Sequence, residues 1–280
     1  MTRTAFPSQR VGAFTVTAIS DGTLTISLEQ LLGMDLDQAT AIQSQAGIRE
    51  PNVLNINCYL IRMGNRMVLV DAGAGGFKQW GGELKTRLRG VGVDPAEIDT
   101  VLLTHAHPDH VGGLLDETGS RVFVNAELWA HHNEITFWTD DEMRDAANER
   151  ARGNFDLARR AFTAYGTSLH SFVEGDLFPG LAAVALPGHT KGHTGFLIDS
   201  EGERLLIWGD IVHFPLVQTS HPEVSITLDT DPVQAADTRQ RLLEVVSREQ
   251  IMVAGSHLSD RGFAIVTKVD NHFHIKNVAE

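Results

Sequence analysis

Three histidines and one aspartate lie within six residues, directly after a short apolar run, and this segment constrains the fold more than any other. They are His105, His107, Asp109 and His110, and the run before them is Val101–Leu103. Side chains two residues apart on an extended backbone share a face, so His105 and His107 can point to one side. Neutral imidazole and carboxylate groups suit zinc and related divalent ions. The segment therefore predicts a metal site at the end of a buried strand rather than a histidine-rich surface loop.

Three more candidate ligands occupy the same kind of position further along the chain. His189, Asp210 and His257 each lie at or just beyond the end of an apolar run, where a loop begins. Strand ends are where rigid scaffolds present catalytic groups. Four ligands from one turn do not complete a site for two ions, so we expect these three residues to supply the rest.

Composition narrows the classes of protein that this chain can belong to. Acidic residues outnumber basic ones, 36 to 23, and the formal net charge of −13 argues against a nucleic-acid groove. The single cysteine, Cys58, excludes an intrachain disulfide and a multi-cysteine zinc site. No run approaches the ~18 apolar residues of a transmembrane helix, and residues 1–10 lack the apolar run of a signal peptide. We therefore expect a cytoplasmic protein that acts on a small molecule and binds neither nucleic acid nor membranes.

No repeat or linker divides the 280 residues, so we expect one domain, with 1–51 as an N-terminal elaboration and 125–180 as a helical insertion near the active site. Helices are predicted from Pro232 to about residue 247, behind the cap residue Asp231, and over 140–165 with a break at 153–154. Several apolar runs predict strands covered on both faces, and Gly64-Asn65 predicts a hairpin turn. The expected strands are 14–19, 53–62, 67–70, 101–103, 122–124, 181–186, 195–198, 205–208, 251–254 and 263–267.

The H-x-H-x-D-H motif, followed in order by His189, Asp210 and His257, resembles that of the metallo-β-lactamase superfamily. The segment 70–73, which contains Asp71, also resembles the family, and the resemblance covers residues 52–258. It implies an α+β fold of the αββα sandwich type, with two mixed β-sheets face to face and helices on the outer faces. It also implies two metal sites that share one carboxylate. The first set of ligands is His105, His107 and His189; the second is Asp109, His110 and His257; the shared residue is Asp210.

The charges of such a site agree with hydrolytic chemistry. Asp109 and Asp210 carry two negative charges against four positive charges on two divalent ions, so the site stays net positive. It can then lower the pKa of a bound water and stabilise an oxyanion. We expect zinc, with manganese, cobalt or iron as alternatives. We also expect Asp109 and Asp210 to take part in catalysis, with Asp210 accepting the proton.

Within the superfamily, the chain most resembles the methyl parathion hydrolase-like branch, near the bacterial lactonases. The resemblance rests on the segments 20–23, 208–213, 229–232 and 254–258. It implies a dinuclear metal-dependent hydrolase that uses a metal-bridging hydroxide to cleave a neutral, partly apolar ester, lactone or phosphotriester. Two alternatives stay open: a mononuclear iron redox enzyme similar to the persulfide dioxygenases, and a thioester hydrolase similar to glyoxalase II.

A second tier of residues is expected to support the ligands or bind the substrate. Asp71 is predicted to orient a ligand histidine. His193 either supports the ligands or caps a turn, and His213 can line the pocket. An exposed Phe137-Trp138 pair would be costly unless it packs, forms a homodimer contact or touches substrate. We predict that this pair lines an apolar entrance to the metal site together with Leu31 and Leu32.

Overall fold

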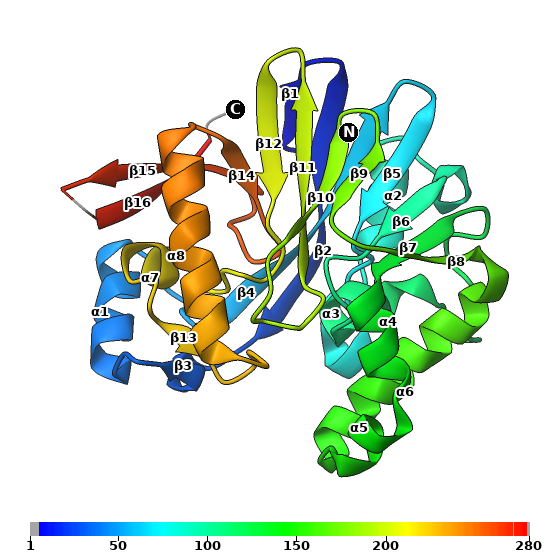
Figure 1. The fold of residues 1–280 in the computed structure, drawn as a ribbon, viewed down its shortest axis with the longest axis horizontal. Coiled ribbons are helices and arrows are strands. Elements are labelled where there is room, and N and C mark those ends of the chain that lie inside the picture. Colours follow the sequence, from blue (N-terminus) through cyan, green and yellow to red (C-terminus); the bar gives the residue numbers. More distant parts are fainter. Residues whose placement is uncertain (1–5, 271, 279–280) are drawn as a thin grey trace.

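The computed structural model describes residues 6–270 and 272–278, and two seven-stranded β-sheets packed face to face form its centre (Figure 1). Side chains from both sheets meet in one buried cluster that includes Val16 and Tyr59 from one sheet and Phe196 and Ile207 from the other. The expected αββα sandwich is confirmed, because helices cover the outer face of each sheet.

The first sheet holds the N-terminal strands in the order β1-β2-β4-β5-β6-β7-β8. It is mixed: β1, β2, β4 and β5 pair antiparallel, whereas β5, β6, β7 and β8 run parallel. The hairpin predicted at Gly64-Asn65 joins β4 to β5. The strands are β1 (Ser8–Val11), β2 (Phe14–Thr25), β4 (Val53–Met63), β5 (Arg66–Val70), β6 (Thr100–Leu102), β7 (Glu127–His131) and β8 (Leu169–Phe172).

The second sheet holds the C-terminal strands in the order β16-β15-β14-β12-β11-β10-β9. Its neighbours pair antiparallel except for β12 and β14, which run parallel. The strands are β9 (Gly175–Phe178), β10 (Leu181–Ala185), β11 (Thr194–Ser200), β12 (Glu203–Ile207), β14 (Met252–Ala254), β15 (Phe263–Val269) and β16 (His272–Asn277).

The helices form the outer layers, and Figure 1 shows α8 on one side of the sandwich and α4–α6 on the other. Helix α8 (Pro232–Arg248) begins at the predicted cap Asp231, whose side chain accepts the Gln234 amide, and it buries Leu243 and Val246 against the second sheet. On the other side, Phe155 and Phe162 pack toward the first sheet. The helices there are α2 (Leu84–Gly90), α3 (Pro108–Val111), α4 (His132–Thr139), α5 (Asp141–Ala146) and α6 (Glu149–Tyr165).

A smaller layer closes one end of the sandwich. The two-residue strands β3 (Leu31–Leu32) and β13 (Ser225–Ile226) pair antiparallel, and α1 (Leu36–Gln45) contacts α7 (Pro215–Ser220). A buried apolar cluster joins these elements to the end of β2. Among the described residues, no helix has both the length and the apolar character needed to cross a membrane.

Two predictions about local structure are wrong. Residues 122–124 form bends and a turn rather than a strand, because only Phe123 is buried there while Val124 is exposed. The helical break lies at 147–148 rather than at 153–154, since the Asn148 side chain accepts the Ala151 amide and caps the start of α6. Gly153 lies inside α6 at an exposed position, where a glycine weakens a helix by only about 1 kcal/mol.

Candidate metal centre

The predicted ligands lie at the ends of strands that run side by side. His105 and Asp71 follow β6 and β5, which are parallel neighbours in the first sheet. Asp210 and His257 follow β12 and β14, the parallel pair of the second sheet. Parallel neighbours end at the same edge of a sheet. The sandwich therefore brings loops from both sheets to one place.

Three ring nitrogens converge in the first group. His105 Nε2 lies 3.0 Å from His107 Nδ1 and 3.2 Å from His189 Nε2, and the last two atoms are 2.9 Å apart. Ligand nitrogens that share a tetrahedral zinc ion at about 2.0–2.1 Å lie about 3.3 Å from one another. The spacing and the chemistry of this donor set fit a divalent cation.

The second group combines carboxylates and imidazoles. Asp109 Oδ2 lies 3.4 Å from His110 Nε2 and 3.7 Å from His257 Nε2. Asp210 Oδ2 lies 3.2 Å and 3.1 Å from the same two nitrogens. All four side chains are buried and their donor atoms lie close enough to hold one ion.

Asp210 connects the two groups. The same Oδ2 atom also lies 3.8 Å from His105 Nε2 and 3.9 Å from His189 Nε2. The other oxygen, Oδ1, is buried and accepts no hydrogen bond from the described residues. This carboxylate therefore faces both donor groups, which is the position that a bridging ligand requires.

The second nitrogen of three predicted ligand rings is held by an acceptor, which is buried for His110 and His189 and partly buried for His257. His110 Nδ1 lies 2.8 Å from Asp71 Oδ2, His189 Nδ1 lies 2.9 Å from Asp229 Oδ1, and His257 Nδ1 lies 2.8 Å from the Asn55 carbonyl oxygen. Such contacts fix the tautomer and orientation of metal-binding rings. Each leaves Nε2 as the free nitrogen that faces the centre.

The structure places the other predicted histidines beside Asp210 in different roles. His193 accepts the Asp210 amide at Nε2 and contacts the Leu186 carbonyl at Nδ1, so both of its nitrogens are engaged. His213 stacks on His257 with ring centroids 5.3 Å apart, and its Nε2 lies 3.5 Å from Asp210 Oδ2. His213 also lines the cavity over the centre.

The site sets the charge of its histidines. Burial, together with the neighbouring His189 ring, lowers the pKa of His107 to about 3, so this ring is in the neutral form that binds metals. Burial also opposes protonation of His110, but Asp210, Asp71 and Asp109 outweigh it and raise the pKa of that ring well above its usual value. The negative charge of the second group is therefore strong enough to hold a positive charge.

A narrow cavity of about 70 Å³ opens over the two groups. Its apolar wall comes from segments far apart in the sequence, and its polar wall adds Thr25, Lys78 and Asn154. The apolar residues are Leu24, Ile26, Trp80, Pro108 and Leu228.

The four residues predicted to line an apolar entrance do not line this cavity. Trp138 is buried behind His107, with ring centroids 5.6 Å apart, and Phe137 packs on Trp138 and on Phe155 in α6. Leu31 is buried in the apolar layer at the end of the sandwich, and Leu32 is exposed on β3. The aromatic pair is not an exposed patch, because α6 covers it.

Two buried carboxylates beside the ligands were not predicted to have these roles. Asp229 orients His189, and Glu134 in α4 accepts hydrogen bonds from both loops of the first group. Asp229 lies in the segment 229–232, which the sequence distinguishes only by its resemblance to the methyl parathion hydrolase-like branch. For Glu134 the sequence shows only a polar residue in an amphipathic segment.

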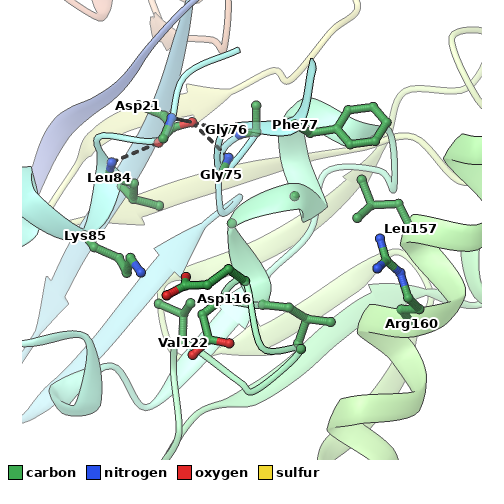
Figure 2. A pocket seen from close by; sticks show the side chains of 17 residues that line it. Asp21, Gly75, Gly76, Phe77, Leu84, Lys85, Asp116, Val122, Leu157 and Arg160 are labelled. Atoms are coloured by element: carbon green, nitrogen blue, oxygen red, sulfur yellow. Dashed lines mark hydrogen bonds between the residues drawn. The ribbon is translucent and has the colours of Figure 1, made fainter. Parts of the chain in front are cut away.

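A larger hollow of about 480 Å³ lies elsewhere and contains none of the predicted ligands (Figure 2). Its rim includes Lys85, Asp116 and Arg160, and Asp21 lies in its wall. The Asp21 carboxylate already accepts backbone N–H groups of Ala74 and Leu84, so its hydrogen bonds hold the chain rather than face a ligand.

Residues 51–257 match the model of the metallo-beta-lactamase superfamily. The chain belongs to this superfamily. A matched relative is the atrochrysone carboxyl ACP thioesterase of Passalora fulva, 27% identical over 158 residues, which are 56% of this chain and 38% of that protein. The chain spans 63% and 38% of the length of the first curated relatives that it matches.

Two solved structures share the whole fold. The hydrolase AbOPH of the beta-lactamase superfamily is 27% identical, with a TM-score of 0.92 and 98% of each chain covered. AidC, described as a dizinc quorum-quenching lactonase, is 23% identical, with a TM-score of 0.89 and coverage of 99% of this chain and 98% of that one. The likeness to AidC shows the fold alone.

The burial of Trp138 generates a stability prediction. Trp138→Ala should lower the free energy of unfolding by about 3–5 kcal/mol, because it leaves a large cavity between α4 and α6. Urea denaturation followed by circular dichroism measures this loss. The ratio of KM values between a long-chain and a short-chain substrate should stay unchanged. If the variant keeps the wild-type stability and this ratio of KM values changes, Trp138 is part of the substrate entrance after all.

Proposed function

We propose that the protein is a dinuclear metal-dependent hydrolase that acts on a neutral, partly apolar ester, lactone or phosphotriester. One observation carries the proposal: Asp210 Oδ2 faces a group of three imidazole nitrogens on one side and an imidazole–carboxylate group on the other. Two such groups around one carboxylate suit a pair of ions better than a single ion.

The chain's own residues define how each ion would be held. His105, His107 and His189 would hold the first, Asp109, His110 and His257 the second, and Asp210 would be shared. Two bound divalent cations, zinc above all, supply a lowered water pKa and polarisation of a carbonyl or phosphoryl oxygen. Manganese, cobalt and iron remain alternatives for the native metal.

The carboxylates of Asp210 and Asp109 are the candidates to accept the proton of the attacking water. Burial disfavours an ionised Asp210, but His110 and His257 outweigh it and hold its pKa well below the usual value, so this carboxylate stays ionised. Its Oδ1 atom has no donor among the described residues, and Asp210 lines the cavity. We assign Oδ1 the role of accepting the hydrogen bond, and then the proton, of the attacking water. Asp109, which also lines the cavity, is the second candidate for this role.

The cavity walls support the choice of substrate class. Leu24, Ile26 and Leu228 form an apolar surface over a centre that is net positive when loaded. Such a pocket suits a substrate with an apolar portion and one polarisable oxygen. Thr25 and Asn154 offer hydrogen bonds that can orient that oxygen or its neighbours.

Thioester hydrolysis is the second candidate, because a matched relative is named a thioesterase. The attack on a carbonyl carbon would use the same residues. A mononuclear iron redox enzyme would need only the first group, and the convergence of Asp109, His110 and His257 favours the hydrolase. A panel of lactones, aryl esters, thioesters and phosphotriesters, assayed on metal-reconstituted protein, separates these functions. Absence of turnover on every member would contradict the proposal.

The metal content is the most direct prediction. Metal-free protein titrated with Zn²⁺ should take up two equivalents per chain, because seven donors exceed the four of one tetrahedral ion. Elemental analysis after gel filtration measures the ratio. One equivalent of iron that is redox-active, with Asp109→Ala fully active, would instead support the mononuclear alternative.

Replacement of the shared carboxylate tests its role. Asp210→Asn keeps the shape but loses the anionic charge, so we expect reduced metal occupancy and a fall in kcat of at least about 100-fold. Both are measured on the same preparation, with folding checked by circular dichroism. A folded variant with two tightly held ions and normal turnover is incompatible with a bridging Asp210.

Trp80 replaces the aromatic pair as the predicted specificity residue. Trp80→Ala should raise KM for long apolar substrates about tenfold, because loss of apolar contact of this size costs about 1.5 kcal/mol. A short ester should show little change. Trp129→Ala is the matched control, since Trp129 is also half-buried but lies on β7 outside the cavity lining. Equal effects of the two variants would argue against a role for Trp80.

A further inference from the structure

Glu134 is a buried carboxylate that contacts both loops of the first donor group. Its Oε2 accepts the amide of Ala106 at 3.0 Å, and Ala106 lies between His105 and His107. Its Oε1 accepts the amide of Gly192 at 3.0 Å and also the Thr190 hydroxyl. Thr190 directly follows His189, and Gly192 lies three residues after it. Each oxygen of one side chain therefore holds one ligand-bearing loop.

The loop after His189 is pressed against this side chain. A Cβ atom at Gly192 would lie 2.8 Å from the Glu134 amide nitrogen and 2.9 Å from its Cγ, too close for any residue but glycine. The Trp138 indole N–H, one turn further along α4, donates to Oε2 at 2.9 Å. The carboxylate is thus fixed by contacts on three sides.

The charge of Glu134 matters as well as its reach. A buried carboxylate is costly unless hydrogen bonds satisfy it, and here four donors point at it. An ionised carboxylate can accept from every direction, whereas the amide of glutamine must turn two N–H groups toward one set of these donors. Replacement by glutamine therefore breaks the link to one of the two loops while keeping the size of the side chain.

We infer that Glu134 is a positioning residue that sets the distance between the His105–His107 turn and the His189 loop, and so the affinity of the three-histidine site for its ion. This inference rests on the proposed metal centre. It also gives α4, which lies in the segment between β7 and β8, a specific role: this helix carries the group that ties together a loop from each sheet. Among the described residues, the hydrogen bonds of the Glu134 carboxylate go to Ala106, Trp138, Thr190 and Gly192, and none goes to a donor of the second group.

The test is a metal titration that needs no substrate. Metal-free Glu134→Gln and wild-type protein are titrated with Zn²⁺ against a chromophoric chelator, and the Co²⁺ forms are compared by their visible absorption bands. One of the two equivalents should bind about 10–100-fold more weakly in the variant, the size of effect seen when the partner of a metal ligand is removed. The weakened equivalent should be the one that His189→Ala abolishes, and its Co²⁺ band should shift.

Asp21→Asn provides a matched control. Asp21 is also a fully buried carboxylate, and it accepts the backbone amides of Ala74, Gly75, Gly82 and Leu84, none of which lies in a ligand loop of the first group. This variant should lose stability but keep both metal affinities and the Co²⁺ spectrum. If both variants weaken metal binding equally, a general loss of stability explains the effect and the inference fails.

A second variant keeps the inference testable if Glu134→Gln does not fold. Thr190→Val removes only the hydroxyl donor to Oε1, so the same equivalent should weaken by a smaller factor. Unchanged zinc affinities in folded Glu134→Gln, with two ions bound to the wild type, overturn the inference alone. A wild type that binds no ion through His105, His107 and His189 overturns the proposed function instead.

Discussion

The Oδ2 atom of Asp210 lies between 3.1 and 3.9 Å from Nε2 of five buried histidines, and the arrangement of the molecule follows from this concentration of polar groups. Carboxylates and imidazoles removed from water cost several kcal/mol each unless charge and hydrogen bonds compensate them. The compensation comes from a layer of acceptors behind the rings and, in the proposed function, from two cations in front of them.

Buried carboxylates hold the loops in place around this centre. Asp71 accepts the Thr104 amide and hydroxyl as well as His110, Asp229 accepts the Ile226 amide as well as His189, and Glu134 joins the loops of the two sheets. In each case one carboxylate bonds both to backbone and to a ligand or its loop. A chain with a net charge of −13 thus uses part of its acidic excess inside the protein, where it orders the loops.

Local sequence patterns predicted much of the sandwich because strands and turns depend on nearby residues. The run at 101–103 and the turn at Gly64-Asn65 were predicted correctly for this reason. The run at 122–124 failed because β-propensity cannot tell a strand from a turn that buries one side chain, here Phe123. The sequence predicts Phe137 and Trp138 at the substrate entrance, whereas in the structure Phe155 of α6 packs against both rings. This packing is a tertiary contact, which a local sequence pattern does not reveal.

The sequence by itself indicated which residues gather at the centre, because each candidate ligand stands beside an apolar run and three histidines share one turn. The resemblance of this ordered motif to that of the metallo-β-lactamase superfamily then implied the sandwich. Only the tertiary structure decided which side chains surround that centre. Leu24, Trp80 and Leu228 line the cavity although they are far apart in the chain. Glu134 reaches acceptor distance of residues 28 and 58 positions away. Such contacts depend on how sheets and helices pack against one another, and a local sequence pattern does not determine that packing.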